Sequence, residues 1–484
     1  MSPSAWLSAI ALVADVGIVV VLIPRIVAQR RESAATLAWV LFILMVPIAG
    51  AVLYHLLGTR RLSRKRRLRL AARQRLSRSA ARAALAPYDI RAKESELEQA
   101  SRLFYVERTS ATRGNEVRLL HGAETYDAIE AAIAEASRYV PVEFYIFHPD
   151  RTGRRILDLL EQRARAGVTV RLLVDAVGAS DLRQKHVAGL VAAGGTFAQF
   201  LPVNLFTRPF SVNFRNHRKI VSVDGHTAFT GGMNVGDESR GGSSWSADGR
   251  RLSGKKRDRF RDTHVRVRGP AALHLQEIFA DDWHFSTGED CAGSAYYPDP
   301  PIAGNVILQV VASGPDQTAE AIHRKLFTAI TRAESRVWLT TPYFIPDRAI
   351  LVALQTAAAR GVDVRLLLPG TSDHRLVLYA GRSYYDELLS SGVRIFEYQA
   401  GFLHAKTMVV DDLWTTIGSA NMDMRSFVLN WEATLVALDR DLARHVARQF
   451  EKDLLEAREI TLPRRRSRSM RMKESASYLL SPLL

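Results

Sequence analysis

The sequence predicts an α/β fold of two similar halves, preceded by an N-terminal helical hairpin. Three observations predict it: two long apolar runs at the start of the chain, strand and helix patterns that alternate after residue 116, and a second occurrence of that alternation. At 484 residues the chain is long enough for about three units of ~150 residues.

The hairpin is expected over residues 1–58 and is predicted to be transmembrane. Residues 5–27 and 34–57 form apolar runs of 23 and 24 residues, each long enough to cross a hydrocarbon core of ~30 Å as a helix. A cleaved signal peptide is disfavoured because no basic residue precedes Trp6 and a second apolar run follows closely, while a buried helical hairpin stays an alternative. Asp15 is costly inside a membrane unless it finds a partner. The second run ends in a basic cluster, so the positive-inside rule places both termini in the cytoplasm.

The positive charge of the chain is concentrated in two segments. The formal net charge is +16, but residues 60–82 contain 11 Lys or Arg and no acid, residues 464–473 contain 6 more, and the remainder sums to about −1. We expect a basic helical arm next to the membrane over residues 59–112, or a solvated linker there, and a basic C-terminal tail over residues 461–484. A nearly neutral body with basic tails favours an anionic membrane surface over nucleic acid, since each basic residue near such a surface contributes ~1 kcal/mol.

Chemistry that depends on cysteine or on a metal is not expected. Cys291 is the only cysteine, which excludes an internal disulfide, and no Cys/His cluster has the spacing of a zinc site. We therefore expect neither a metal nor another cofactor.

The body shows one strand–helix–strand pattern twice. Residues 141–147 and 168–174 are predicted strands around a helix at 154–166 that ends at Gly167. Residues 337–345 and 362–368 are predicted strands around a helix at 350–360 that ends at Gly361. The two glycine-plus-strand segments align at an offset of 194 residues. An internal duplication explains this pattern, with a first half at 113–297 and a second half at 298–460.

Each half contains one motif of histidine, lysine, aspartate and asparagine at the same spacing. The first copy consists of His217, Lys219, Asp224 and Asn234, and the second of His404, Lys406, Asp411, Ser419 and Asn421. On a strand, residues two apart point to the same side, so each histidine would lie beside its lysine. A proton-transfer or nucleophilic group, a fixed cation and an amide suit an anionic phosphoryl group. The two copies make one two-histidine site if the halves face each other.

The repeat also indicates two acids that could orient the histidines. Asp262 follows the first motif and Glu432 follows the second, and each begins a predicted strand. A carboxylate there is well placed to bind the second nitrogen of an active-site imidazole and fix its tautomer. The alternative is a surface salt bridge.

A long loop over residues 239–261 occurs in the first half alone. It contains 8 basic residues against Asp248 and Asp258, together with several glycines and serines. Because it connects Asn234 to Asp262, we expect it at the mouth of the site. It either attracts an anionic lipid headgroup or is a solvated loop.

These motifs resemble the signature of the phospholipase D superfamily, a duplicated His-x-Lys-x4-Asp-x6-Gly-(Gly/Ser)-x-Asn. Within it, the chain is similar end to end to the bacterial cardiolipin synthases. The resemblance is carried by the N-terminal hairpin and by Asn216-His217-Arg218-Lys219, Gly231-Gly232-Met233-Asn234, Asp262-Thr263-His264-Val265, Ser313-Gly314-Pro315, residues 341–347 and Asn421-Met422-Asp423-Met424-Arg425-Ser426. The basic loop before Asp262 departs from the pattern.

The resemblance implies that each half is a β-sheet flanked by helices and that the two halves form one cleft, which contains the site. It also implies transfer of a phosphatidyl group from one phosphatidylglycerol to another, without a metal, at the bacterial inner (cell) membrane. It implies that His217 is the nucleophile and His404 the general acid and base, although the nearly symmetric motifs do not distinguish them. Oxygens of the phosphate would be held by Lys219, Lys406, Asn234, Asn421 and Ser419. Asp224 and Asp411 belong to the motif, and we interpret them as turn residues more than as catalytic ones.

Three other functions fit parts of this pattern. A phospholipase D that uses water or another alcohol would share the site and differ in its acceptor pocket. A nuclease of the same superfamily is disfavoured by the hairpin and the nearly neutral body. A membrane scaffold with a dead site predicts loss of a motif residue, and none is lost. Six further histidines are expected to be structural or exposed, with the alternative that His264 lines the cleft: His226, His264, His274, His284, His323 and His374.

Overall fold

The computed structural model describes residues 3–29, 33–54, 81, 83–90, 110–202, 213–241, 260–291, 296–316 and 320–481. Most of the basic arm predicted at 59–112 lies outside these residues, as does the greater part of the basic loop predicted at 239–261.

The N-terminal segment forms three helices that pack on one another. They are α1 (Pro3–Val27), α2 (Ser33–Met45) and α3 (Pro47–Leu53). The prediction of one helix over 34–57 is wrong, because Pro47 has no N–H to continue the helix and Val46 leaves the helical conformation with a φ of −141°. Among the described residues, no helix is both long and apolar enough to cross a membrane.

The first half alternates strands and helices, and a short 3-10 turn, η2 (Ala86–Tyr88), precedes it. Its elements are β1 (Ala111–Leu120), α6 (Ala123–Glu135), β2 (Tyr139–Phe144), α7 (Arg151–Arg165), β3 (Thr169–Asp175), α8 (Gln184–Ala192), β4 (Thr196–Phe200), β5 (Arg215–Asn216), β6 (Lys219–Val223), β7 (Thr227–Gly231), β8 (Phe260–Arg261), β9 (His264–Arg268) and α9 (Pro270–Thr287).

The second half repeats this series and then extends it. Its elements are β10 (Val306–Ser313), α10 (Ala321–Arg332), β11 (Arg336–Thr340), β12 (Phe344–Ile345), α11 (Arg348–Ala359), β13 (Asp363–Pro369), α12 (Arg375–Ser383), α13 (Tyr385–Ser390), β14 (Arg394–Tyr398), β15 (Phe402–Leu403), β16 (Thr407–Val410), β17 (Trp414–Gly418), β18 (Met422–Asp423), the π-helical turn η7 (Arg425–Leu429), β19 (Asn430–Leu438), α14 (Arg440–Leu455), β20 (Ala457–Ile460) and α15 (Arg468–Leu479).

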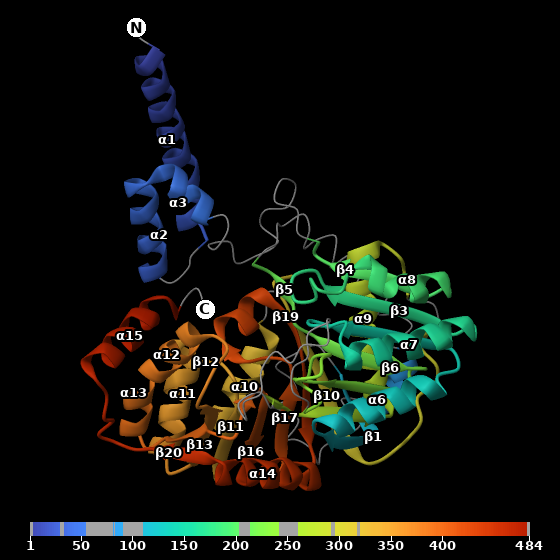
Figure 1. Ribbon diagram of the computed structural model, residues 1–484. Helices are drawn as coiled ribbons and strands as arrows, with labels where there is room; N and C mark the ends of the chain where they lie inside the picture. The colour runs from blue at the N-terminus through green and yellow to red at the C-terminus, as the bar shows by residue number, and fades with distance from the viewer. Residues whose placement is uncertain are drawn as a thin grey trace.

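One large sheet joins the two halves (Figure 1). Sixteen strands of the described residues belong to it, in the order β20-β14-β13-β11-β16-β17-β19-β10-β1-β9-β7-β6-β2-β3-β4, with β5 paired to β19. Read outward from the centre, β1-β9-β7-β6-β2-β3-β4 mirrors β10-β19-β17-β16-β11-β13-β14. The antiparallel pair of β1 with β10 lies between them, with Ala111 opposite Gln309. The predicted duplication is therefore confirmed as an α/β fold of repeated halves.

The repeat extends to the signals that begin and end helices. Asp150 caps α7 by accepting a hydrogen bond from the Gly153 N–H, and Asp347 caps α11 from the Ile350 N–H, both at 3.0 Å. Gly167 and Gly361, predicted as helix ends, follow these helices with φ values of 87° and 90°. The predicted strand at 337–345 is instead divided into β11 and β12.

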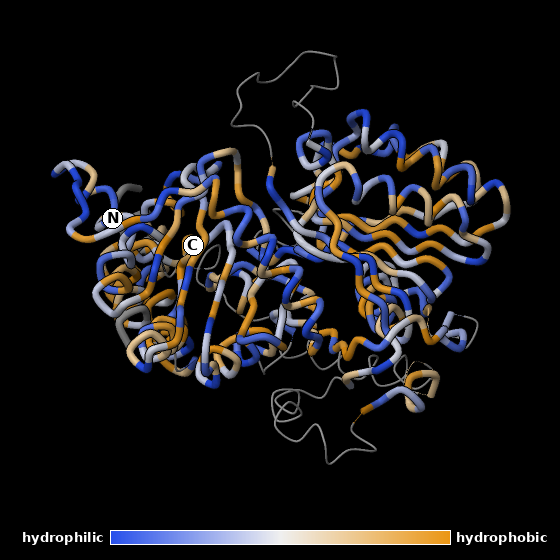
Figure 2. Tube along the Cα trace, turned by 90° about the horizontal axis from the view of Figure 1, so that it is seen from below, coloured by the Kyte–Doolittle hydropathy of each residue, from blue (hydrophilic) through white to orange (hydrophobic). Residues whose placement is uncertain are grey.

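The core lies between the sheet and its helices, and Figure 2 shows apolar strands inside a more polar exterior. One apolar cluster crosses the boundary between the halves and includes Ile220, Val265, Val310, Ile417 and Leu435. Burial of this shared cluster ties the halves together, because apolar area is removed from water only while both are in place.

The C-terminal segment is folded onto the second half. β20 extends the sheet beside β14, and α15 packs on α12. Arg464 and Arg466 form ion pairs with Asp386 and Glu474; the Arg464–Glu474 pair is 3.0 Å long. The segment from 461 to 481 is thus an integral part of the body and no loose tail.

Candidate active site

Each motif histidine lies just before a strand of the large sheet. β6 begins at Lys219 and β16 begins after Lys406, so His217 and His404 belong to the extended segments that lead into these strands. The predicted strand placement is wrong by about two residues at its start. The backbone N–H of His217 donates to the Trp431 carbonyl at 2.9 Å, and that of His404 donates to the Arg261 carbonyl at 2.8 Å.

These backbone bonds exchange partners between the halves. Trp431 precedes Glu432 in the second half, and Arg261 precedes Asp262 in the first. Nδ1 of His217 lies 3.0 Å from both carboxylate oxygens of Glu432. The short strand pairs β5 with β19 and β8 with β15 set this register.

The second histidine has the reciprocal arrangement. Nδ1 of His404 lies 2.6 Å from the carboxylate of Asp262, and both groups are buried. Each histidine therefore bonds to the acid of the opposite half, which brings the two motifs into one site. The two acids predicted as orienting groups both contact an imidazole.

Electrostatics favour neutral imidazoles and ionised acids in this site. Burial lowers the pKa of His217 to about 4, and burial and then Lys406 lower that of His404. Burial raises the pKa of Glu432, but its bond to His217 and the charge of Lys219 outweigh burial and hold that pKa at about 2. An ionised carboxylate only accepts, so Nδ1 of His217 donates and Nε2 keeps its lone pair.

Two buried lysines supply positive charge beside the histidines. Lys219 Nζ donates to the His217 carbonyl at 2.6 Å, and Lys406 Nζ donates to the His404 carbonyl at 2.5 Å. Burial lowers the pKa of Lys219 to about 7 and that of Lys406 to about 8. An anion bound here would favour the charged form of both side chains.

The motif aspartates lie at the far ends of their strands. Asp224 follows β6 with a φ of 51°, and at ~3.3 Å per residue it is ~16 Å along the strand from Lys219. Its carboxylate accepts hydrogen bonds from the backbone N–H groups of Ser137, Arg138 and Tyr139. Asp411, with a φ of 53°, does the same for residues 334–336. Both aspartates hold the start of the neighbouring strand and do not contact the histidines.

The two asparagines and the serine of the motifs differ in whether their side-chain oxygens already have hydrogen-bond partners. Oδ1 of Asn421 is buried and has no hydrogen-bond partner in the described part of the chain. Oδ1 of Asn234 accepts from the Ile146 N–H at 3.3 Å. The Ser419 hydroxyl donates to Glu432 and accepts from the Ala433 N–H, so its placement favours a positioning role over the phosphate-binding role predicted from the sequence.

Gly232 occupies the position of Ser419 in the first half. A Cβ atom at Gly232 would lie 2.1 Å from Oδ1 of Asp262. The missing side chain thus makes room for Asp262, whereas in the second half the serine hydroxyl bonds to Glu432.

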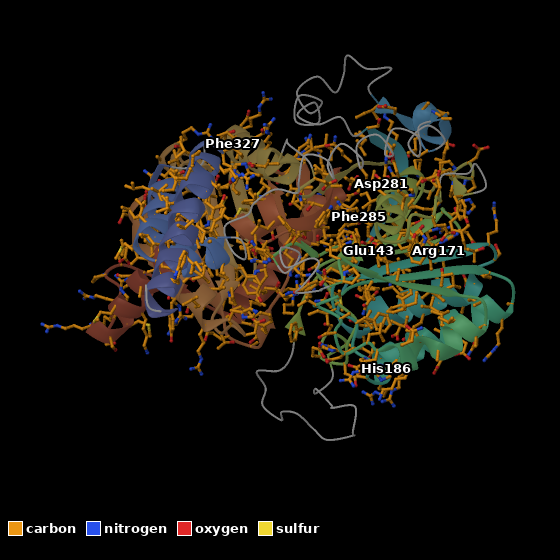
Figure 3. The ribbon with its side chains drawn as sticks, turned by 90° about the horizontal axis from the view of Figure 1, so that it is seen from above. Glu143, Arg171, His186, Asp281, Phe285 and Phe327 are labelled. Carbon is orange, nitrogen blue, oxygen red and sulfur yellow. The ribbon has the colours of Figure 1, made fainter. Side chains whose placement is uncertain are left out.

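Sequence reasoning missed a buried network behind His217. The Arg218 guanidinium donates to Asp282 and to the carbonyls of Glu432 and Ser313, the last two at 3.2 Å. Asn216 bonds to Glu143, and burial, then Asp282, raise the pKa of Glu143. Figure 3 shows Glu143 on the side of Arg171 that faces the second half, which is marked by the label of Phe327. Alternation along the chain could have shown that Arg218 points away from His217 and Lys219.

Aromatic rings flank both imidazoles. The Tyr145 ring lies 4.9 Å from that of His217, and Lys219 Nζ lies 5.4 Å from the Tyr145 ring. Phe260 and Phe402 lie 5.8 and 5.7 Å from the His404 ring. His264 is buried on β9 opposite Gly231 of β7, and neither ring nitrogen has a hydrogen-bond partner among the described residues. Within the same residues, no group of three or more His, Cys, Asp or Glu side chains is arranged to hold a metal ion.

The duplicated fold and the two exchanged histidine–acid pairs define a phospholipase D-like protein. Residues 129–243 and 326–454 match the family described as "Cardiolipin synthase, PLD-like domain", and residues 5–58 match "Phospholipase_D-nuclease N-terminal". The chain belongs to the cardiolipin synthase family.

Individual proteins with similar sequences or folds are consistent with this assignment. Cardiolipin synthase 2 of Bacillus anthracis is 42% identical over 370 residues, covering 76% of this chain and 70% of that protein. Cardiolipin synthase A of Pseudomonas putida (strain W619) is 39% identical over 462 residues, covering 94% of each. The crystal structure of phosphatidylserine synthase from Haemophilus influenzae Rd KW20 shares the fold, with a TM-score of 0.56 at 14% identity over 76% of this chain and 95% of that one.

Proposed function

We propose that the protein is a cardiolipin synthase that transfers a phosphatidyl group between two phosphatidylglycerol molecules, giving cardiolipin and glycerol through a phosphohistidine. The observation that supports this most is the reciprocal bonding of His217 to Glu432 and of His404 to Asp262. It leaves two oriented imidazoles beside two lysines, which suits a displacement at phosphorus with one nucleophile and one proton carrier.

In the first step, Nε2 of His217 attacks the phosphorus of one phosphatidylglycerol. The bond from phosphorus to the glycerol oxygen breaks, and a protonated His404 gives its proton to that oxygen. The pKa of about 4 keeps His217 neutral and nucleophilic at neutral pH. The bound phosphodiester anion favours protonation of His404, while Lys219 and Lys406 stabilise the charge that builds on the non-bridging oxygens.

In the second step, a second phosphatidylglycerol takes the place of the released glycerol. His404, now neutral, takes the proton from its terminal hydroxyl as the oxygen attacks the phosphohistidine. The phosphorus–nitrogen bond breaks, which restores His217 and releases cardiolipin. Water in the same position would give phosphatidic acid, the reaction of a phospholipase D.

A vesicle assay with labelled phosphatidylglycerol tests this function. Wild type should give cardiolipin and an equal amount of glycerol, and His217→Ala and His404→Ala should each lower the rate by at least 10³-fold. Phosphatidic acid without cardiolipin would identify a hydrolase instead. A loss of activity with a chelator that added metal restores would contradict a mechanism that uses these residues alone.

We also propose that helices α1–α3 attach the enzyme to the bacterial cell membrane, with the body on the cytoplasmic side. Their large exposed apolar side chains support this: Trp6, Ile10, Leu12, Val13, Val16, Val20, Val21, Val27, Leu37, Leu41, Leu44, Met45, Val46, Ile48, Val52 and Leu53. So large an apolar surface is unfavourable in water. Removal of residues 1–58 should move the protein from the membrane fraction to the supernatant, and protease added outside intact spheroplasts should leave the body uncut.

A further inference from the structure

The C-terminal helix α15 presents an apolar and basic face to solvent. Its opposite side is buried on the second half through Glu474 and Ser477. Arg468, Met472 and Leu479 follow the i, i+4, i+11 spacing that places residues on one side of a helix. Met472 is 73% exposed and Leu479 is 77% exposed. Large apolar side chains are thus displayed where polar ones would be expected on a helix that faces water.

The basic residues of this segment divide into two groups. Arg464 and Arg466 are compensated by Asp386 and Glu474. The other four are exposed and form no ion pair within the described residues: Arg465, Arg468, Arg471 and Lys473. Of these four, Arg465 precedes α15, and Lys473 Nζ lies 5.9 Å from the ring centroid of Tyr379 in α12. The outward face of α15 therefore combines the apolar side chains with the positive charges of Arg468 and Arg471.

This face lies on elements that lead directly to the site. α15 packs on α12, and Gly381 of α12 lies so close to β12 that a Cβ atom there would be 2.9 Å from the Phe344 carbonyl oxygen. β12 pairs with β18, where Ile345 is opposite Asp423, two residues after Asn421. Figure 1 shows α15, α12 and β12 together, with α14 at the opposite side of the second half.

We propose that the outward face of α15 binds the surface of an anionic lipid bilayer and holds the active site against the membrane that contains its substrate. This rests on the proposed function, in which substrate and product are both anionic phospholipids. Met472 and Leu479 would enter the boundary between headgroups and acyl chains, while the basic side chains contact the phosphates. A second copy of the chain fits this face less well, because the positive charges of Arg468 and Arg471 would meet the same charges on the other copy.

A fluorescent label at the face tests the contact itself. Cys291 is the only cysteine, so Met472→Cys in a Cys291→Ser background gives one site for an environment-sensitive dye in the full-length protein. Leu455→Cys on α14 is the matched control, since Leu455 is 86% exposed and lies on another helix. Emission at 472 should shift to the blue and gain intensity in phosphatidylglycerol vesicles but not in phosphatidylcholine vesicles, and emission at 455 should not change. Equal emission in both vesicles, or equal shifts at both positions, would overturn the proposal.

Two sets of substitutions test what the contact does. Met472→Glu with Leu479→Glu removes the apolar contact, and Arg468→Gln with Arg471→Gln removes positive charge from the same face. On vesicles, each set should raise the apparent KM for surface phosphatidylglycerol at least fivefold, with Leu455→Glu as the control. With short-chain phosphatidylglycerol in detergent micelles, which offer no bilayer, their rates should equal the wild-type rate.

The outcomes separate this inference from the proposed function. Equal losses on vesicles and micelles would show that α15 supports the fold and would overturn membrane binding. If the number of chains per particle changed while the emission of the dye at position 472 did not, the face would bind a second copy of the chain, and this result would also overturn membrane binding. A wild type that makes no cardiolipin would contradict the proposed function, while the label at 472 would still test the membrane contact.

Discussion

Nδ1 of His217 lies 3.0 Å from the Glu432 carboxylate, which belongs to the other half of the chain. Each oriented imidazole is therefore built from both halves, and removing one acid should affect one histidine more than the other. Because these hydrogen bonds are buried, water does not compete for them, and loss of one partner costs more than at a surface.

The first prediction concerns the two acids. Glu432→Gln should slow formation of the phosphoenzyme about 100-fold, because the amide no longer fixes the Nδ1–H tautomer of His217. Asp262→Asn acts on His404 and should be rescued in that first step by a donor with a p-nitrophenol leaving group, which needs no proton. Rapid quenching with labelled donor measures both. If the p-nitrophenol donor rescued Glu432→Gln and not Asp262→Asn, His404 would be the nucleophile and His217 the general acid.

The second prediction is a bell-shaped dependence of kcat/KM on pH. As pH falls through about 4, His217 gains a proton and loses its nucleophilic lone pair. As pH rises through about 7 to 8, Lys219 and then Lys406 lose the charge that holds the phosphate. The pKa of His404 is lowered from its ordinary value, so its acid form is lost first as pH rises; His404 therefore begins the alkaline limb, and the two lysines continue it. An alkaline limb above pH 9 would contradict charged lysines as the phosphate ligands.

The third prediction separates structure from chemistry in the motif. Asp224→Asn and Asp411→Asn should each destabilise the fold by about 1–3 kcal/mol, because several backbone N–H groups lose a charged acceptor. The folded-state pKa of both aspartates is lowered, since backbone and side-chain donors outweigh burial, so this stability is present above their unfolded pKa and is lost as pH falls below it. Urea unfolding measures it. At a temperature where the variants are folded, their kcat should be close to wild type, whereas His217→Ala should show the opposite pattern.

The fourth prediction concerns Arg218. Arg218→Met should destabilise the protein by about 3–5 kcal/mol, because it leaves the buried Asp282 carboxylate without its partner. The double variant Arg218→Met, Asp282→Leu should recover part of that loss. Arg348→Gln, which removes an exposed ion pair with Glu387, is the control and should change stability by less than about 0.5 kcal/mol. Equal melting temperatures for Arg218→Met and Arg348→Gln would contradict the role of the network.

Much of the fold was predictable because its signals are local. Gly167 and Gly361 end equivalent helices, and the repeated motif revealed the duplication. The sequence also predicted that Asp262 and Glu432 would orient imidazoles. It could not show that each serves the opposite histidine, because strand register across the halves depends on contacts far apart in the chain. The role of the Ser419 hydroxyl could not be predicted either, because only the packed structure shows that this hydroxyl donates its hydrogen bond to Glu432.

The pairing of β1 with β10 bears on how such a chain arose. A polypeptide of half this length would carry a histidine without its acid and an acid without its histidine. Two identical units that paired through the β1–β10 edge would complete both histidine–acid pairs. Association of two identical subunits would therefore have been needed for activity in a half-length form of the fold. Fusion into one chain then fixed that association and let Ser419 and Gly232 diverge, which two identical subunits could not do.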